Sequence, residues 1–406
     1  MKIVIVGNGV AGTICGKTVR ELDSQAEITI VSEEPHPYYP RPNLIDFLAG
    51  LIPLEKVFAF GENWAERQRL ELRLGQRVLS VDPAGLAVEL SDGSRLKADH
   101  LVLATGARPS VPPVPGNDLK GIFTVRTLDD VLGLLDYVYL RPQVVILGGG
   151  LLGLEIARAL SLRGLDRISV VEVFPRLLPR QLDETGARML QSYLEAIGLK
   201  FYTGQQAAEI VGDGQVRGVR LQDGRMIPAE AVIFASGVKP RLELAQAAGL
   251  PCSSGVVVDD YLRTGCDRIY AIGDVAEHRG RVYGLIPAAF EQARVLAYNL
   301  CGQEKRYEGT VPFSTLKVAG IYLTSVGLIS PEGDNFEIVS SYRPESGIYK
   351  KLVLKNDRVV GAIWFGTRKG AQEIARLVQS GKKINQYKNE ILEEGFDFSV
   401  IFDQPL

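Results

Sequence analysis

The stretch KIVIVGNGVAGTICGKTV, residues 2–19, decides the fold because it joins a strand, a glycine turn and a helix. Residues 3–6 are four consecutive β-branched residues, which predicts a short buried strand. Gly7, Gly9 and Gly12 then have the spacing of a dinucleotide-binding turn that opens a helix. Gly7 permits the tight turn, Gly9 lets backbone amides approach a pyrophosphate, and Gly12 lets the helix pack closely on the strand.

A pair of acids follows this turn at the distance expected for ribose recognition. A second strand is predicted over residues 27–32, and it is followed by Glu33 and Glu34. They lie about twenty residues beyond the glycines, where a carboxylate accepts hydrogen bonds from an adenosine ribose. The alternative is a glycine-rich turn without a ligand. The strand before the turn, the helix after it and the acid at the right distance all favour the dinucleotide site.

The same pattern recurs in VVILGGGLLGLEIARALSLRG, residues 144–164. Gly148, Gly150 and Gly153 repeat the register of the first turn, and Glu172 follows again about twenty residues later. Two complete fingerprints indicate two similar domains that bind two nucleotides, unless one of the two sites has decayed. The Glu172 carboxylate favours a free ribose 2′-hydroxyl and would repel a 2′-phosphate, which predicts NAD rather than NADP. Two nearby arginines could weaken that preference or could be solvated surface charges; they are Arg176 and Arg180.

Composition limits the class of protein. The 406 residues predict two or three domains, and 46% hydrophobic with 23% charged residues is typical of a globular chain. The net charge of -2 gives no reason to expect nucleic acid or an anionic membrane as a partner. No apolar run reaches the roughly 20 residues of a membrane span, so we expect a cytoplasmic protein. The four cysteines form no C-x-x-C pair, and neither a disulfide framework nor a metal site is expected.

The segments between the two turns predict the edges of the first domain. A proline-rich loop precedes a short helix expected over residues 44–48, and its residues 41–43 are well placed to close over a ligand. Residues 70–103 predict a small antiparallel meander. A strand over residues 101–104 should break at Thr105 and Gly106.

The second half of the chain predicts three further features. A meander over residues 216–235 should break at Gly237, and a strand over 269–272 is ended by Gly273 and Asp274. A helix should start at Pro287 and end at Gly302. From Thr310 the composition shifts to a third domain of antiparallel strands and one helix, with a hairpin at Asn356–Asp357.

The order of the motifs GNGVAG, LATGARP, GGGLLGLE and IYAIGD resembles that of the two-dinucleotide-binding-domain flavoproteins, the fold of glutathione reductase and its relatives. A further set, AEHRGRVYGL, FEQARVLA, STLKVAG and YKKLVLKNDRVVGA, is similar to NADH:rubredoxin reductases and to the flavin half of NADH-dependent nitrite reductase large subunits. This resemblance covers nearly the whole chain.

The resemblance implies an α/β fold with two doubly wound Rossmann-like domains, one for FAD and one for NAD(H), plus a small C-terminal α+β domain. The implied segments are 1–112 and 240–310 for the FAD domain, 113–239 for the NAD domain, 311–384 for the C-terminal domain and 385–406 for a tail of unknown role. The residues expected to bind FAD are Gly7, Gly9, Val10, Ala11, Gly12, Glu33, Glu34, Arg41, Pro42, Asn43, Ala104, Thr105, Gly106, Arg108, Gly273, Asp274, Pro287, Ala288 and Glu291. Those expected to bind NAD(H) are Gly148, Gly150, Leu151, Leu152, Gly153, Glu172 and Gly237.

Two departures from the family pattern concern its redox groups. The segment from Ser32 to Leu51 has no cysteine, although disulfide reductases and thiol-dependent oxidases of this fold carry one there. The ferredoxin reductases have R-P-P-L-S-K where this chain has RPNLID, so Asp46 replaces the lysine that would pair with Glu155. We expect Asp46 to be an ordinary helix-face carboxylate or a group near the flavin. Lys317 is a candidate positive charge near the flavin, and Glu155 is expected to help the second glycine turn and Gly237 arrange the nicotinamide on the flavin.

The expected function is electron transfer between NAD(H) and a separate rubredoxin, ferredoxin or iron–sulfur subunit of a redox complex, in either direction. Docking of that partner is expected near residues 41–46 and 314–317, with the aromatic tail 396–402 as a second contact ordered only by the partner. Two alternatives remain open. One is an NADH oxidase or quinone or dye reductase, and the other is an FAD- and NADH-responsive binding protein of the apoptosis-inducing-factor type.

Overall fold

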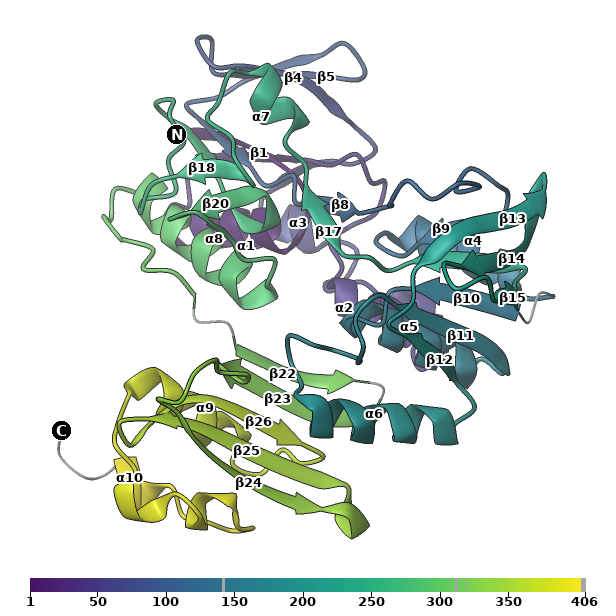
Figure 1. Cartoon of the computed structure of the whole chain (residues 1–406). Coiled ribbons are helices and arrows are strands. Elements are labelled where there is room, and N and C mark those ends of the chain that lie inside the picture. Colours follow the sequence, from purple (N-terminus) through teal and green to yellow (C-terminus); the bar gives the residue numbers. More distant parts are fainter. Residues whose placement is uncertain (141–142, 311–312, 319, 403–406) are drawn as a thin grey trace. The chain divides into compact units, whose positions relative to one another are not determined.

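The computed structural model describes residues 1–140, 143–310, 313–318 and 320–402, and for 313–318 and Asn385 it describes the backbone alone (Figure 1). The chain forms two compact units. The first unit consists of residues 1–47, 51–109 and 238–310, and the second of residues 48–50, 110–237 and 311–406. Each of the two units is therefore assembled from stretches that are far apart in the sequence.

The core of the first unit is a parallel sheet of five strands, in the order β19-β7-β1-β2-β3. β1 (Lys2–Val6) is central, with β2 (Glu27–Val31) on one side and β7 (His100–Leu103) on the other. The outer strands are β3 (Glu71–Arg73) and β19 (Ile269–Ala271). Strands with neighbours on both sides and cover on both faces are apolar throughout, which explains the β-branched run in β1.

Two helices from opposite ends of this unit's sequence pack side by side. They are α1 (Val10–Leu22) and α8 (Ile286–Leu300) (Figure 1). The buried side chains of both helices are largely small, with Ala11, Gly12 and Gly16 on α1 and Ala289 and Ala293 on α8. Small residues let the helix axes approach closely and bring the start of α8 into the same unit as the first glycine turn.

Smaller elements complete the first unit. The strands are β4 (Val78–Asp82), β5 (Ala87–Leu90), β6 (Arg95–Lys97), β8 (Ala107–Pro109), β17 (Val238–Pro240), β18 (Val256–Val258), β20 (Ala276–His278) and β21 (Arg281–Val282), and the helices are α3 (Trp64–Arg67) and α7 (Glu243–Ala247). The meander predicted over residues 70–103 is formed by β4, β5 and β6, while β3 joins the parallel sheet. The helix predicted over residues 44–48 begins earlier, as α2 (Arg41–Leu48). Pro42 is tolerated there because the first helical turn needs no backbone N–H donor.

The second unit repeats the parallel sheet, in the order β12-β11-β10-β16-β9. Its elements are β9 (Ile122–Thr124), α4 (Leu128–Val138), β10 (Gln143–Leu147), α5 (Leu151–Leu162), β11 (Arg167–Glu172), α6 (Glu184–Ala196), β12 (Lys200–Thr203) and β16 (Ala231–Phe234), with an antiparallel sheet of β13 (Ala207–Asp213), β14 (Gln215–Leu221) and β15 (Met226–Pro228). The registers of the two parallel sheets correspond. Gly7 donates its N–H to Val31, and Gly148 donates its N–H to Val171, each at 2.8 Å.

The second unit also holds a five-stranded antiparallel sheet, in the order β22-β23-β26-β25-β24. Its elements are β22 (Phe313–Val318), β23 (Ile321–Gly327), β24 (Glu337–Arg343), β25 (Ile348–Lys355), β26 (Arg358–Phe365) and α9 (Ala371–Ser380). Asn356 and Asp357 have φ of 53° and 62° between β25 and β26, as the predicted two-residue hairpin requires. The predicted class, α/β with two similar parallel sheets and a C-terminal α+β domain, is confirmed.

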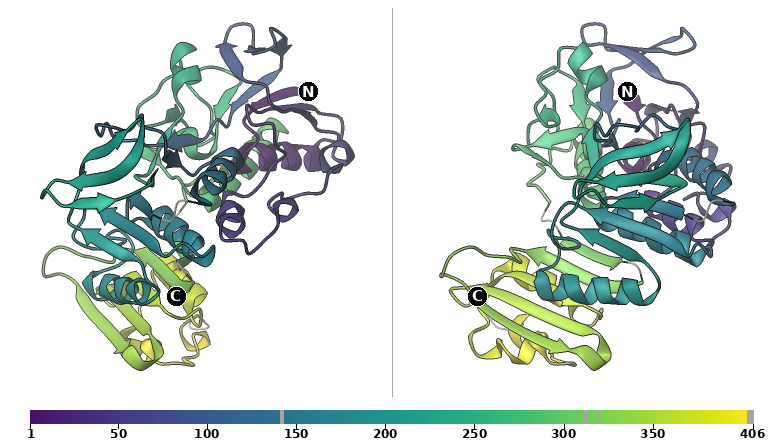
Figure 2. Two further views of the ribbon diagram at one scale, coloured as in Figure 1. Left: turned by 90° about the vertical axis from the view of Figure 1, so that its right-hand side faces the viewer. Right: turned by 45° about the vertical axis from the view of Figure 1, so that its right-hand side comes forward.

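The expectation that the tail is ordered only by a partner is wrong, because its described residues pack on the C-terminal sheet, while its role as a second contact of the partner stays a prediction. Ile391, Leu392, Phe398 and Ile401 are buried in one cluster with residues of β25, β26 and α9. Lys382 donates to the backbone carbonyls of the last helix, α10 (Ser399–Phe402). In Figure 2 the yellow C-terminal helices lie against the yellow-green sheet. Apolar side chains at this spacing find a surface within their own domain, so no partner is needed to order them.

Candidate functional site: two dinucleotide turns

The first glycine turn leaves open space at the N-terminus of α1. Gly7 has φ of +122°, and a Cβ there would overlap the carbonyl oxygen of Ala104, just as a Cβ on Gly12 would overlap the oxygen of Gly7. Around Gly9, by contrast, a Cβ would meet nothing within 4 Å. Gly9 is the N-cap of α1 and provides no side-chain cap, so the first N–H groups, starting at Val10, remain for an anion.

The second glycine turn has the same construction. Gly148 has φ of +126°, and Gly153 packs against its carbonyl oxygen. A Cβ on Gly150 would meet nothing within 4 Å, and α5 starts at Leu151 without a side-chain cap. Each turn therefore excludes side chains where the backbone packs together and stays open where a pyrophosphate would lie. These are the features that a dinucleotide requires, and both turns fit one.

Glu172 is held against the second turn by backbone donors. Its side chain ends β11 and is 6% exposed. One carboxylate oxygen accepts the N–H of Gly149 at 2.6 Å, and the other accepts the N–H of Phe174 at 2.9 Å. The remaining lone pairs can accept ribose hydroxyls. The predicted preference of this carboxylate for NAD over NADP stays a prediction.

The first unit places its two acids differently. In register, the residue after β2 that corresponds to Glu172 is Ser32, because Val31 and Val171 occupy the same position beside the glycine turns. Glu33 comes next and is ion-paired with Arg241. Glu34 is paired with Arg41 at 2.6 Å. Ribose contacts of Glu33 and Glu34 stay a prediction, and both carboxylates already have cationic partners.

Arg241 was not singled out from the sequence, yet it joins three predicted residues. Its N–H donates to the carbonyl of Gly106 at 3.0 Å, and its carbonyl accepts the hydroxyl of Thr105 at 3.2 Å. Its guanidinium pairs with Glu33. The residue lies more than one hundred positions away in the sequence, so no local pattern could have identified it.

A hydrogen-bond network connects the Gly273–Asp274 turn with α8. Gln292 is 1% exposed and accepts the N–H of Gly273 at 2.7 Å. On the same helix, Glu291 accepts the hydroxyl of Thr310. Thr310 also bonds the Tyr307 hydroxyl at 2.7 Å. The network fixes the start of α8, where Pro287 occupies the first turn and Ala288 is buried.

The other predicted site residues have the following environments. Asp46 is exposed on α2, while Asn43 donates its amide to the carbonyl of Val57 at 3.0 Å. Arg108 on β8 is ion-paired with Glu243. Glu155 is partly exposed on α5. The backbone of Lys317 pairs with Tyr322, but its side chain lies outside the description.

Three of the four cysteines have thiols whose pKa is raised by burial. Cys15 is fully buried on α1, and burial raises the pKa of its thiol to about 12. Burial also raises the pKa of Cys252 and of Cys301, and all four thiols are free. A thiol with a raised pKa stays protonated at neutral pH and is a poor nucleophile.

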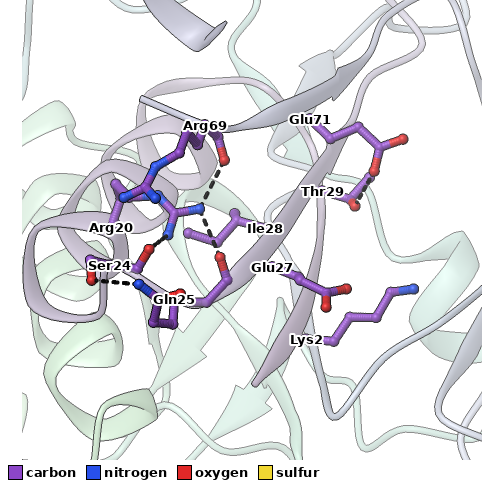
Figure 3. A pocket seen from close by; sticks show the side chains of 10 residues that line it. Lys2, Arg20, Ser24, Gln25, Glu27, Ile28, Thr29, Arg69 and Glu71 are labelled. Atoms are coloured by element: carbon purple, nitrogen blue, oxygen red, sulfur yellow. Dashed lines mark hydrogen bonds between the residues drawn. The ribbon is translucent and has the colours of Figure 1, made fainter. Parts of the chain in front are cut away.

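A polar pocket of about 360 Å³ lies where the strands of the first sheet begin, at the end opposite to the glycine turn (Figure 3). Its lining includes Lys2 and Glu27, the first residues of β1 and β2, whereas the glycine turn follows the last residue of β1. Arg20 in its wall donates to the carbonyls of Ala26 at 2.7 Å and of Arg69 at 2.8 Å. Its guanidinium is thus used to hold the backbone, and the pocket is separate from the dinucleotide turn.

The family model for the pyridine nucleotide-disulphide oxidoreductases matches residues 1–293, which include both glycine turns. The chain belongs to this family. Residues 312–382 match the C-terminal domain of rubredoxin NAD⁺ reductases. Members of the pyridine nucleotide-disulphide oxidoreductase family bind FAD and NAD(H), and the two open turns of this chain fit these two groups.

Relatives of the family agree with this assignment. A nitrite reductase [NAD(P)H] of Bacillus subtilis is 38% identical over 95% of this chain and 48% of its own length. The NADH-rubredoxin oxidoreductase of Clostridium acetobutylicum is 29% identical, over 95% of this chain and 96% of its own. The crystal structure of a ferredoxin reductase from Rhodopseudomonas palustris matches with a TM-score of 0.89 and 28% identity, covering 98% of this chain and 99% of that one. The chain spans about half the length of the nitrite reductase.

Among the helices of the described residues, none has the length and apolar character needed to cross a bilayer.

Proposed function

We propose that the protein is an FAD-dependent NADH oxidoreductase that exchanges electrons with a separate rubredoxin, ferredoxin or iron–sulfur subunit. The proposal rests on the two open dinucleotide turns, on Glu172 and on the rubredoxin-reductase type of the C-terminal domain. The cytoplasmic location and the docking of a partner near residues 41–46 and 314–317 stay predictions. The side chains of the second of these segments lie outside the description.

The chain's residues would perform four tasks in this reaction. The turn at Gly7–Gly12 and the start of α1 would hold the FAD pyrophosphate, and Asp274 would bind the ribityl chain. The start of α8 would place its positive end toward the flavin pyrimidine edge. Glu172 would select NADH through its ribose hydroxyls. FAD, when bound, accepts a hydride from NADH and can pass electrons on singly.

The positions of the cysteines and the raised pKa of Cys15 are the main support for an external electron acceptor. No cysteine lies between Ser32 and Leu51, and Cys15 is buried with a pKa raised to about 12. The chain therefore has no cysteine in the segment where the disulfide reductases of the same fold carry theirs. An external one-electron carrier is the acceptor that this arrangement supports best.

Stopped-flow reoxidation of the NADH-reduced holoprotein tests the proposal. Rubredoxin, a plant-type ferredoxin and oxygen are each offered as the sole acceptor. We expect at least one iron–sulfur protein to reoxidise the flavin at least tenfold faster than oxygen does. Reoxidation by oxygen as fast as by every iron–sulfur protein would favour an NADH oxidase instead. The reverse reaction, reduction of NAD⁺ by the reduced carrier, can be followed on the same proteins.

A further inference from the structure

A buried polar node joins the NAD domain to the C-terminal domain within the second unit. Asp183 is the N-cap of α6, and one carboxylate oxygen accepts the N–H of Gly186 at 3.0 Å. The other oxygen accepts the Tyr349 hydroxyl at 2.7 Å and the Lys351 ammonium at 2.9 Å. Tyr349 and Lys351 both lie on β25. The side chains of Lys351 and Asp183 are only 8% and 17% exposed.

This node is a fixed contact rather than a surface ion pair. Burial alone would raise the pKa of Asp183, but hydrogen bonds from Lys351, the Gly186 N–H and Tyr349 lower it, so the carboxylate is ionised. Loss of one partner from a buried pair leaves an uncompensated charge and is strongly unfavourable. The three side chains therefore keep β25 and the start of α6 in one arrangement.

Asp183 ends the loop that begins directly after Glu172. We call residues 173–183 the adenosine loop. Its Phe174 N–H holds the Glu172 carboxylate, and its Leu177 lies beside Gly149, where an added Cβ would meet both the Leu177 and the Glu172 side chains at 2.9 Å. The loop is also anchored by Leu177, Leu178 and Leu182, which are 0–1% exposed. A shift of its far end at Asp183 would thus be transmitted to the residues that hold Glu172.

We propose that Tyr349 and Lys351 are positioning residues for NADH, which act on Glu172 through Asp183 and the adenosine loop. The proposal rests on the proposed NADH site at Glu172. Neither residue is placed at the nucleotide, and their effect is to fix where the Glu172 carboxylate lies. By linkage, anything that moves the C-terminal domain changes NADH affinity, and bound NADH resists that movement to the same extent.

The chain provides a matched control on the same strand. Lys350 adjoins Lys351 but points to the opposite face of the sheet, where its ammonium donates to the carbonyl of Leu392 at 2.9 Å. It is 3% exposed and the Lys351 side chain is similarly buried, so both substitutions remove a buried ammonium from β25. Only the change at Lys351 removes a partner of Asp183.

The experiment uses the FAD-loaded full chain. Calorimetric titrations with NAD⁺ and NADP⁺ measure binding without reducing the flavin. We expect Lys351→Met to weaken NAD⁺ binding about tenfold and NADP⁺ binding by less than twofold, so that discrimination between the two narrows. Lys350→Met should leave both affinities within twofold. Lys351→Arg, which retains the charge, should recover most of the NAD⁺ affinity.

Tyr349→Phe keeps the ion pair and serves as the second variant should Lys351→Met not fold. This variant should bind NAD⁺ several-fold more weakly in the same calorimetric titration. It should also speed amide hydrogen exchange in the adenosine loop, which mass spectrometry measures. Equal losses for NAD⁺ and NADP⁺, or NAD⁺ affinity within twofold of the parent in both Lys351→Met and Tyr349→Phe, would overturn the proposal. Failure of the proposed NADH site would show differently, as a parent protein that does not prefer NAD⁺ to NADP⁺.

Discussion

Glutamates of the two units show how neighbouring groups decide what a side chain can do. The Glu172 carboxylate is bonded by backbone N–H groups of Gly149 and Phe174, which hold it in place without neutralising its charge. The Glu34 carboxylate is paired with the Arg41 guanidinium, which compensates the charge locally. The same residue type is thus held by backbone donors in one unit and is half of an ion pair in the other.

Glu172→Ala should weaken NADH binding by about 1.5–3 kcal/mol, or roughly 10- to 100-fold, because it removes charge-assisted hydrogen bonds to ribose hydroxyls. The gap between NADH and NADPH should narrow, since the carboxylate that repels a 2′-phosphate is gone. Steady-state KM values for both nucleotides measure the change. Glu195→Gln, at an exposed position of α6, is the control and should change neither KM value. Equal turnover of both nucleotides by the parent would contradict this role of Glu172.

Replacement of all four cysteines by serine should leave flavin reduction by NADH intact. Cys15 has a pKa of about 12 and is protonated at neutral pH, and the pKa values of Cys252 and Cys301 are raised as well. A buried hydroxyl at position 15 can lower the yield, so the rate per bound FAD is the quantity to compare by stopped flow. A tenfold fall in that rate would favour a thiol-dependent reductase instead.

Among the elements, those predicted correctly are the ones with local signals. The strand, turn and helix at residues 2–22 follow from β-branched residues and glycine spacing within one short window. The extra turn at the start of α2 could not be predicted from the sequence. Proline is tolerated in the first turn of a helix but disfavours a helix at later positions, so Pro42 fits either a loop or a helix start. Contacts made by Arg241 and Gln292 join distant segments, and no local pattern encodes such contacts.

Asp274→Ala should reduce FAD affinity roughly 10- to 100-fold, because a carboxylate bonded to a ribityl hydroxyl contributes about 1.5–3 kcal/mol. The element behind this prediction is the short turn Gly273–Val275, which Gln292 fixes to α8 through the Gly273 N–H. The ratio of flavin to protein absorbance after dialysis measures the loss. Asp267→Ala, at a side chain that is 90% exposed, is the matched control and should retain the flavin. A variant at Asp274 that keeps full flavin content would remove this residue from the site.

At the scale of the whole molecule, the sequence predicted the similar pair of parallel sheets but not the place of the tail. The described tail residues complete the apolar cluster between the C-terminal sheet and α9. The sequence did not predict this packing, because the short apolar runs after residue 385 have neither the spacing of a helix nor the alternation of a strand. The C-terminal domain therefore includes more of the chain than its family match, which ends at residue 382.

Truncation after Gln386 should destabilise the C-terminal domain by several kcal/mol, because burial of one large apolar side chain contributes about 1.5–3 kcal/mol. Four such side chains are lost, namely Ile391, Leu392, Phe398 and Ile401. We expect the melting temperature of this domain to fall by at least about 5 °C in calorimetry. Phe398→Ala should reproduce part of the loss, and Val400→Ala, at a side chain that is 38% exposed, should not. An unchanged melting temperature in the truncated chain would mean that the tail is dispensable for folding.

The adjacent lysines of β25 also constrain how the sequence can change in length. Neighbouring residues of a strand face opposite sides, so Lys350 reaches the tail while Lys351 reaches Asp183. One residue inserted within β25 would turn every later side chain to the other face and bring Leu352, which is fully buried, toward the polar node. An insertion in the connection after Gly327 would leave this alternation intact. Insertions and deletions are therefore better tolerated in the loops of this domain than within β25.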